Sequence, residues 1–416
     1  MNAGSANDLD ALGQRTLNAL AAPVATPQHR EFASATGESS FVPAEPPVDP
    51  RQPLSVRQPR STRSTRITGI DAARGVAMFG MVIVHFVNFR EDRGERLTEF
   101  AELFNGRAMP LFMLLGGIGV TFLTRRSSTP ERDLTIRALL LFALGLFMSE
   151  HVPRLAIVLQ AYGLFFILST VLYRLPSKLL VALVPVVTAV GAVTYQLVGD
   201  PPVQTLFGDL GSGEGIQSLL FDGFYPLFPV GAFFILGIVL GRIDLRSDRV
   251  ACALAGVGIV AGVGIPVLSN GLVERFGWQT DFGGRLGDGM FHFSRLLDST
   301  GHSAMPAWVL SALGTSVAVL GLSLLIAPRV PMLVRPIVAV GSMSLTFYVY
   351  QAWLTNLVPP TSETSAGVEW ILALAVYGSF VLFALLWQIM FRSGPLERVI
   401  RIGSGPRVSQ ASTTVS

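Results

Sequence analysis

The sequence predicts an all-α, polytopic integral membrane protein, a bundle of about ten transmembrane helices that follows a disordered N-terminal tail. Half of the 416 residues are hydrophobic and only 14% are charged. The mean hydropathy of +0.52 is well above that of a soluble globular chain. The apolar residues also fall in blocks of about 17 to 25, the length at which one helix crosses a bilayer. One membrane domain is therefore expected rather than two or three soluble domains.

Residues 1–66 begin the chain without sustained periodicity and are rich in Pro, Ser, Thr, Ala and Arg. This composition is typical of a disordered segment. No charged start is followed by a compact apolar stretch, so a cleaved signal peptide is not expected. The last part, residues 51–66, holds five arginines and no acidic residue.

The transmembrane domain is predicted over residues 67–391, because ten stretches in it are long and apolar enough to be spans. They are 67–89, 104–124, 134–150, 154–173, 179–198, 224–241, 250–269, 305–327, 337–358 and 368–391. Glycines spaced four residues apart, Gly237 with Gly241 and Gly258 with Gly262, predict close packing between helices.

Charge in the connections predicts the orientation of the bundle, because cytoplasmic loops hold more Lys and Arg than outer loops. With the N-terminal tail inside, twenty Lys and Arg lie on the inner side, counting residues 51–66, against seven in the outer loops. We therefore expect a protein of the cell (plasma) membrane with residues 1–66 and 392–416 as cytoplasmic tails.

Several classes of function are excluded by composition. Cys252 is the only cysteine, so an intramolecular disulfide or a thiolate metal site cannot form. No glycine-rich turn ends in Lys followed by Ser or Thr, which argues against a phosphate-binding loop. The net charge of +3 is small. We therefore expect the lipid bilayer as a partner and expect no nucleic acid and no metal.

The chemistry is concentrated in the first span, which contains Asp71, Arg74 and His85. On a helix, Arg74 and His85 differ by about 20° in azimuth and ~16 Å in height, so they share one face at two depths. Asp71 lies three residues before Arg74, at the spacing of an ion pair. Ionisable residues inside a span are candidates for function because they are costly there. The structural alternatives are a snorkelling Arg74 and a satisfied interfacial His85.

These residues resemble a known family. The run Arg66-x-x-x-x-Asp71-x-x-Arg74-Gly75 followed by His85 is similar to the opening of the membrane acyltransferase superfamily. The chain resembles most the YeiB-like and heparan-α-glucosaminide N-acetyltransferase-like bacterial membrane proteins. The likeness continues in 105–119, 222–229, 302–303 and 341–348.

The resemblance implies an acyltransferase that moves an acyl group, acetyl in the heparan-type family, from cytoplasmic acyl-CoA to an extracytoplasmic sugar or glycoconjugate. Acyl-CoA is then a co-substrate and no bound cofactor is expected. In this hypothesis Asp71 orients Arg74, Arg74 meets the donor, and His85 acts as base or acyl carrier. The chain departs from the heparan-type enzyme, which has Asn at the position of His85.

Four further residues are candidates for substrate binding, each with a structural alternative. Arg107 can bind an anionic or carbonyl group, or anchor a helix end. Asp222 and Tyr225 can hold an acceptor hydroxyl, or form a helix cap and an interfacial aromatic. His302 can join His85 in an outer-facing pocket, as can His151, or either can be an interfacial histidine.

Two other functions are compatible with the same residues. A non-enzymatic transporter or permease would use Asp71, Arg74 and His85 to line a substrate or proton path. A membrane scaffold would use the basic residues 51–66 to bind anionic lipid or a partner.

Overall fold

The computed structural model describes residues 66–87, 100–197, 226–279, 290–357, 365–391 and 393–403. Over these residues the chain is helical, without a strand, as the predicted all-α class requires. The α-helices are α2 (Thr68–Phe86), α4 (Ala108–Thr124), α5 (Pro130–His151), α6 (Leu159–Leu172), α7 (Ser177–Leu197), α10 (Leu227–Leu240), α11 (Asp248–Phe276), α12 (Pro306–Ile326), α13 (Pro331–Gly341), α14 (Ser344–Leu357), α15 (Ala366–Met390) and α16 (Pro395–Gly403). A short 3₁₀ helix, η3 (Phe293–Leu297), precedes α12.

In the part of the chain that the structure describes, six helices are long and apolar enough to cross a membrane: α2, α5, α7, α11, α12 and α15. The pair α13 and α14 makes a seventh if it is one broken span, bent by 68°. Helices α4, α6 and α10 are apolar but shorter. Each predicted span overlaps at least one of these helices. The membrane bundle is thus confirmed, while the count of ten spans stays a prediction.

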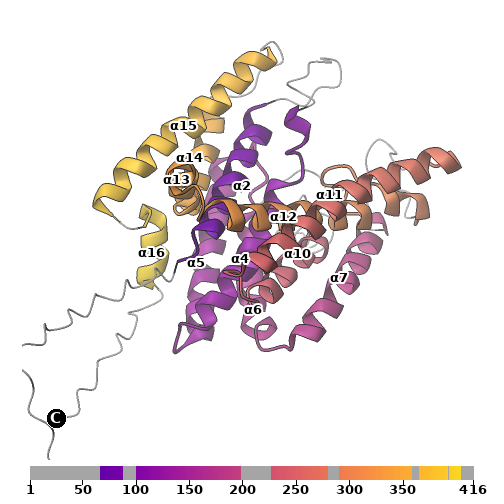
Figure 1. Ribbon diagram of the computed structural model, residues 1–416, viewed down its shortest axis with the longest axis horizontal. Helices are drawn as coiled ribbons and strands as arrows, with labels where there is room; N and C mark the ends of the chain where they lie inside the picture. Colours follow the sequence, from indigo (N-terminus) through magenta and orange to yellow (C-terminus); the bar gives the residue numbers. More distant parts are fainter. Residues whose placement is uncertain are drawn as a thin grey trace, which may run out of the picture. The chain divides into compact units, whose positions relative to one another are not determined.

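Helix α2 contacts α4, α12, α13, α14 and α15, and it lies among them in the ribbon drawing (Figure 1). Its closest neighbour is α13. A Cβ on Gly75 would lie 2.1 Å from the carbonyl oxygen of Ile337, and one on Gly341 would lie 1.8 Å from the carbonyl oxygen of Asp71. The absence of side chains at these two glycines therefore lets the two backbones touch, as small residues do between membrane helices.

Glycines make two other helix contacts of the same kind. A Cβ on Gly117 of α4 would meet the backbone of Phe234 in α10 at 2.1 Å. A Cβ on Gly258 of α11 would meet the backbone of Ala318 in α12 at 2.3 Å. Gly237 likewise lies against the backbone of α4. The predicted role of the glycines in close packing is confirmed at these positions.

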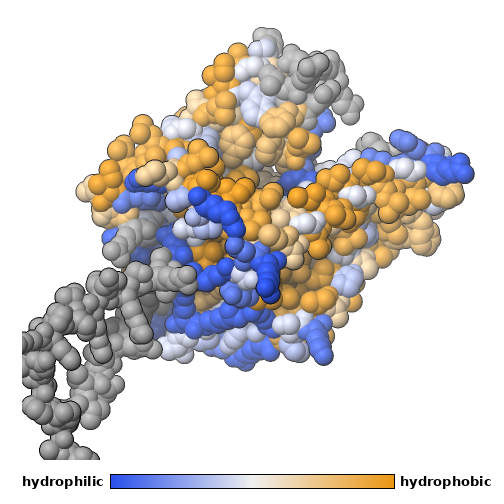
Figure 2. Space-filling view, viewed as in Figure 1, coloured by the Kyte–Doolittle hydropathy of each residue, from blue (hydrophilic) through white to orange (hydrophobic). Residues whose placement is uncertain are grey.

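The surface outside these contacts is apolar over α11 and α15, as the space-filling view shows (Figure 2). Val260 of α11 is 73% exposed, and Ile389 of α15 is 77% exposed. Such a surface fits lipid and not water.

The break between α13 and α14 is stabilised from the C-terminal side. Glu397 of α16 accepts hydrogen bonds from the backbone N–H groups of Leu345, at 2.7 Å, and Thr346, at 3.2 Å. A carboxylate at the first turn satisfies N–H groups that have no partner within the helix. Helix α16 lies in the predicted C-terminal tail, where the sequence analysis predicted no helix.

Candidate functional site

A small cavity of about 30 Å³ lies beside the C-terminal end of α2. It brings together α2, the start of α4, the residues before α6, the loop before α12, and α14. Its lining residues are Met81, Val84, His85, Phe104, Gly106, Ala108, Met109, Ala156, Val158, His302 and Tyr348. Three of them, His85, Tyr348 and His302, carry side chains that can exchange or share a proton.

His85 contacts Gln351 of α14. Its Nδ1 lies 2.8 Å from Oε1 of Gln351. A carbonyl oxygen only accepts hydrogen bonds, so Nδ1 is the nitrogen that carries the hydrogen. In a neutral imidazole, Nε2 then has a free lone pair. His85 can therefore act as a base toward a group in the cavity.

Tyr348 of α14 contributes a hydroxyl to the same cavity. Its oxygen accepts a hydrogen bond of 3.3 Å from the backbone N–H of Val158, which precedes α6. This contact leaves the hydroxyl hydrogen available for donation. Tyr348 can therefore donate to a carbonyl oxygen that lies near His85.

His302 reaches the cavity from a tight loop. Asp298 accepts hydrogen bonds from the backbone N–H of Thr300, at 2.9 Å, and from its hydroxyl, at 2.6 Å. His302 has φ +65° and Ala304 has φ +59°, both in the left-handed region that side chains rarely adopt. Backbone strain of this kind is concentrated at functional sites in proteins.

The loop fits against the start of α4 because Gly106 has no side chain. Gly106 has φ +66°, and a Cβ there would lie 2.7 Å from Cα of Gly301 and 2.9 Å from Nε1 of Trp308. The ring of Trp308 in turn lies 6.1 Å from that of His302. The local sequence thus allows α4 and the His302 loop to approach closely enough to share one cavity.

Burial, and to a smaller extent the nearby imidazole of His85, lowers the pKa of His302 to about 4. The loop that carries it lies outside the candidate membrane spans. His302 is therefore neutral at physiological pH, and it can donate or accept a hydrogen bond without adding a charge to the cavity.

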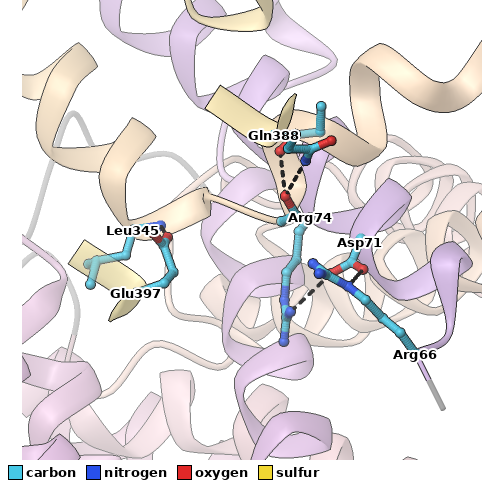
Figure 3. Close-up of polar contacts among 8 residues, drawn as sticks. Arg66, Asp71, Arg74, Leu345, Gln388 and Glu397 are labelled. Carbon is cyan, nitrogen blue, oxygen red and sulfur yellow. Dashed lines mark hydrogen bonds and ion pairs between the residues drawn. The ribbon is translucent and has the colours of Figure 1, made fainter. Parts of the chain in front are cut away.

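The opposite end of α2 carries charge. The buried carboxylate of Asp71 is paired with Arg66 and, at 3.4 Å, with Nη1 of Arg74 (Figure 3). The ion pair predicted from the spacing of Asp71 and Arg74 is thus present. Arg74 extends over α4, where a Cβ on Gly119 would lie 3.6 Å from its Nη2. Arg74 and His85 are eleven positions apart, which corresponds to a rise of ~16 Å.

A second cavity, of about 270 Å³, lies at this charged end. It is lined by Ile67, Phe122, Arg125, Arg242, Ile243, Asp244, Leu245 and Arg246. Arg242 is fixed by Ser177, at 2.9 Å, and by the carbonyl oxygen of Tyr173, also at 2.9 Å. With three arginines and one carboxylate, the lining is suited to an anion.

The other predicted residues lie elsewhere. Arg107 donates to Ser311 of α12 at 2.8 Å and does not line the cavity of His85. His151 bonds to the carbonyl oxygen of Phe147, one turn earlier in α5, and does not line it either. Asp222 and Tyr225 lie outside the described residues. Within the described ranges no cluster of His, Cys, Asp or Glu is arranged to hold a metal ion.

Sequence reasoning missed Gln351 and gave Tyr348 no role. A signal was present, because the two lie three residues apart in an apolar span and so share a helix face. Their position beside His85 depends on how α14 packs against α2, which the sequence alone does not give.

Two family models match the chain. Residues 66–260 match the model described as heparan-alpha-glucosaminide N-acetyltransferase, catalytic. Residues 289–404 match the model described as protein of unknown function (DUF418). No curated protein matches the chain. The resemblance drawn from the sequence is confirmed: the chain is a membrane protein similar to an acetyltransferase catalytic domain, with a YeiB-like C-terminal part.

Proposed function

We propose that this chain, a multi-pass membrane protein similar in its N-terminal half to an acetyltransferase catalytic domain, is an acyltransferase. It transfers an acyl group, acetyl by the family name, from cytoplasmic acyl-CoA to an extracytoplasmic carbohydrate. The observation that carries the proposal is the shared cavity of His85, Tyr348 and His302, which lies at one end of α2 in the matched segment.

The acyl-transfer step follows from the hydrogen bonding of His85. Nε2 accepts the proton of an acceptor hydroxyl or amine while that group attacks the thioester carbonyl carbon. Tyr348 donates a hydrogen bond to the carbonyl oxygen as it gains negative charge. The carbon–sulfur bond then breaks, and the proton on His85 passes to the departing CoA thiolate. Atoms and charge balance without a further reactant.

A covalent route uses the same residues. Nε2 would attack the thioester itself, release CoA, and carry the acyl group until the acceptor removes it. Incubation with acetyl-CoA without acceptor, followed by mass spectrometry, separates the routes. An acetyl adduct on His85 supports the covalent route, and an unmodified His85 in an active protein supports direct transfer.

The charged end of α2 is suited to the donor. The phosphates of acyl-CoA are anionic, and the cavity at Arg125 and Arg242 lies at the end of α2 that carries Arg74. From there the pantetheine arm would extend along α2 for ~16 Å to reach His85. This arrangement requires the Arg74 end to face the cytoplasm, which is the orientation that loop charge predicts in the cell membrane.

The first experiment compares purified wild type with His85→Ala in proteoliposomes, with acetyl-CoA as donor. Glucosamine is the acceptor probe because the name of the matched family specifies a glucosaminide. Loss of the base should lower the rate of acetyl transfer about 10²- to 10⁴-fold. His151→Ala is the matched control, because His151 lies outside the cavity.

Unchanged transfer by a folded His85→Ala protein would falsify the assignment of His85. The transporter alternative makes a different prediction in the same vesicles. It would give movement of the sugar across the membrane without acetylation, measured with radiolabelled glucosamine.

A further inference from the structure

Gln351 is a buried polar residue with few hydrogen-bond partners around it. Its side chain is fully buried in α14, where Phe347 and Ala352 are fully buried as well. Oε1 contacts Nδ1 of His85, while Nε2 has no hydrogen-bond partner among the atoms that the structure describes. A buried amide hydrogen left without a partner costs about 1–3 kcal/mol. A leucine of similar volume would avoid this cost but would take the acceptor from His85, so the amide gives little net gain in stability.

The contact with His85 does give the amide a chemical consequence. A neutral imidazole can carry its hydrogen on either nitrogen, and the hydrogen bond made by one nitrogen decides which. Because Oε1 accepts from Nδ1, it keeps the hydrogen there and leaves Nε2 unprotonated. The hydrogen bond from Nδ1 to Gln351 also limits rotation of the imidazole ring of His85.

The neutrality of Gln351 also suits its position inside the membrane domain. A carboxylate at the same place would orient His85 equally well, but it would add a buried charge and favour the imidazolium. The titratable groups that line the cavity with His85 are Tyr348 and His302. An amide therefore orients the base while leaving it uncharged.

We propose that Gln351 is a positioning residue that holds His85 in the tautomer with hydrogen on Nδ1, so that Nε2 is the proton acceptor in acyl transfer. The kinetic part of the proposal rests on the proposed function. The tautomer itself does not, and it can be measured without turnover.

The kinetic test uses Gln351→Leu and Gln351→Glu in the reconstituted full chain. Gln351→Leu removes the acceptor and should lower kcat about 10- to 100-fold, with KM for acetyl-CoA unchanged within about twofold. Gln351→Glu keeps an oxygen that accepts a hydrogen bond from Nδ1. It should retain more activity than Gln351→Leu at alkaline pH, where the imidazolium that the carboxylate favours loses its proton from Nε2. Gln388→Leu is the matched control, because Gln388 bonds to Ser342, between α13 and α14 (Figure 3), and should leave kcat unchanged.

Thermal denaturation in detergent separates positioning from folding. Gln351→Leu removes an unsatisfied buried amide but also takes the acceptor from Nδ1 of His85, so the two effects offset and its Tm should stay close to that of wild type. A large fall in kcat without a fall in Tm is the expected pattern. If kcat and Tm fall together, Gln351 acts in folding and the positioning role is overturned.

Nitrogen NMR of protein labelled with ¹⁵N-histidine measures the tautomer directly. The chain has five histidines, so the signal of His85 can be assigned by its loss in His85→Gln. Wild type should show a protonated Nδ1 and an unprotonated Nε2, and Gln351→Leu should show a mixture of tautomers. Gln351→Glu should show both nitrogens protonated at neutral pH and an unprotonated Nε2 only at alkaline pH. Identical His85 signals in wild type and Gln351→Leu would overturn the proposal. If wild type shows the Nδ1–H tautomer but transfers no acetyl group, the proposed function fails and the positioning of His85 stands.

Discussion

Helices α2 and α11 are both long and apolar enough to cross a membrane, yet they are built for different surroundings. Mean hydropathy is 1.3 in α2 and 2.2 in α11, whereas the buried share is 72% in α2 and 22% in α11. The less apolar helix is thus the more buried one. Hydropathy alone does not decide burial in this bundle, because α12 has the same mean hydropathy as α11, 2.2, and is 67% buried. What distinguishes α2 from α11 is that other helices enclose it, so that its polar side chains find partners.

Adding a methyl group to one glycine of each helix tests whether α2 is enclosed and α11 is not. In α2, a Cβ on Gly75 would meet the carbonyl oxygen of Ile337 at 2.1 Å, so Gly75→Ala should lower stability by more than about 3 kcal/mol. In α11, no atom lies within 4 Å of a Cβ on Gly264, so Gly264→Ala should be neutral or stabilising by up to about 1 kcal/mol.

Thermal denaturation of both variants in the same detergent measures the difference. Equal Tm values for Gly75→Ala and Gly264→Ala would contradict the enclosed position of α2. The result does not depend on any activity.

A second prediction concerns pH at the enclosed end of α2. Burial lowers the pKa of His302 from its ordinary value of 6.5 to about 4. Between these values the unfolded chain binds a proton that the folded chain does not, so stability should fall as pH falls from 6.5 to 4. The loss should reach about 3 kcal/mol. Below pH 4 both states are protonated, and this contribution changes no further.

His302→Asn should flatten this pH dependence, because asparagine tolerates the left-handed backbone and does not titrate in this range. His151→Asn is the control, because His151 is exposed in α5. The Tm of wild type and both variants, measured from pH 4 to pH 7, checks the prediction. A wild-type slope retained in His302→Asn would contradict it.

A third prediction concerns the KM for acetyl-CoA and compares an arginine of α2 with one of α11. Arg74→Ala should raise KM for acetyl-CoA about tenfold, the equivalent of ~1.4 kcal/mol, with a smaller change in kcat. Arg275 lies exposed in the last turn of α11, and Arg275→Ala should leave KM unchanged. Steady-state kinetics of both variants give the answer. A tenfold rise in KM in both would point to a general effect of charge.

The sequence predicted the helices well because each apolar block is continuous. All ten predicted spans contain helix, but two features depend on tertiary contacts. The block at 337–358 is divided into α13 and α14, whose junction is held by Glu397 from outside the block. Helix α11 runs on to Phe276, beyond the predicted end at residue 269. Hydropathy measures neither a cap from a distant residue nor a polar helix extension.

The site was predictable in part. Asp71 could be paired with Arg74, and Arg74 could be placed on one face with His85, because the three lie on a single helix with a fixed period. Sequence reasoning could not separate His302, which lines the cavity, from His151, which does not. It also missed Gln351, because the contact with His85 joins residues 266 positions apart. Contacts between helices depend on packing, which periodicity does not determine.

The cavity of His85 has a consequence for how the chain can be divided. His85, Phe104 and Gly106 come from the segment that matches one family, whereas His302 and Tyr348 come from the segment that matches the other. Neither segment alone contains a complete lining. The two matched segments therefore build one cavity together, and a gene fragment encoding either segment would be expected to regain the cavity only when co-expressed with its complement.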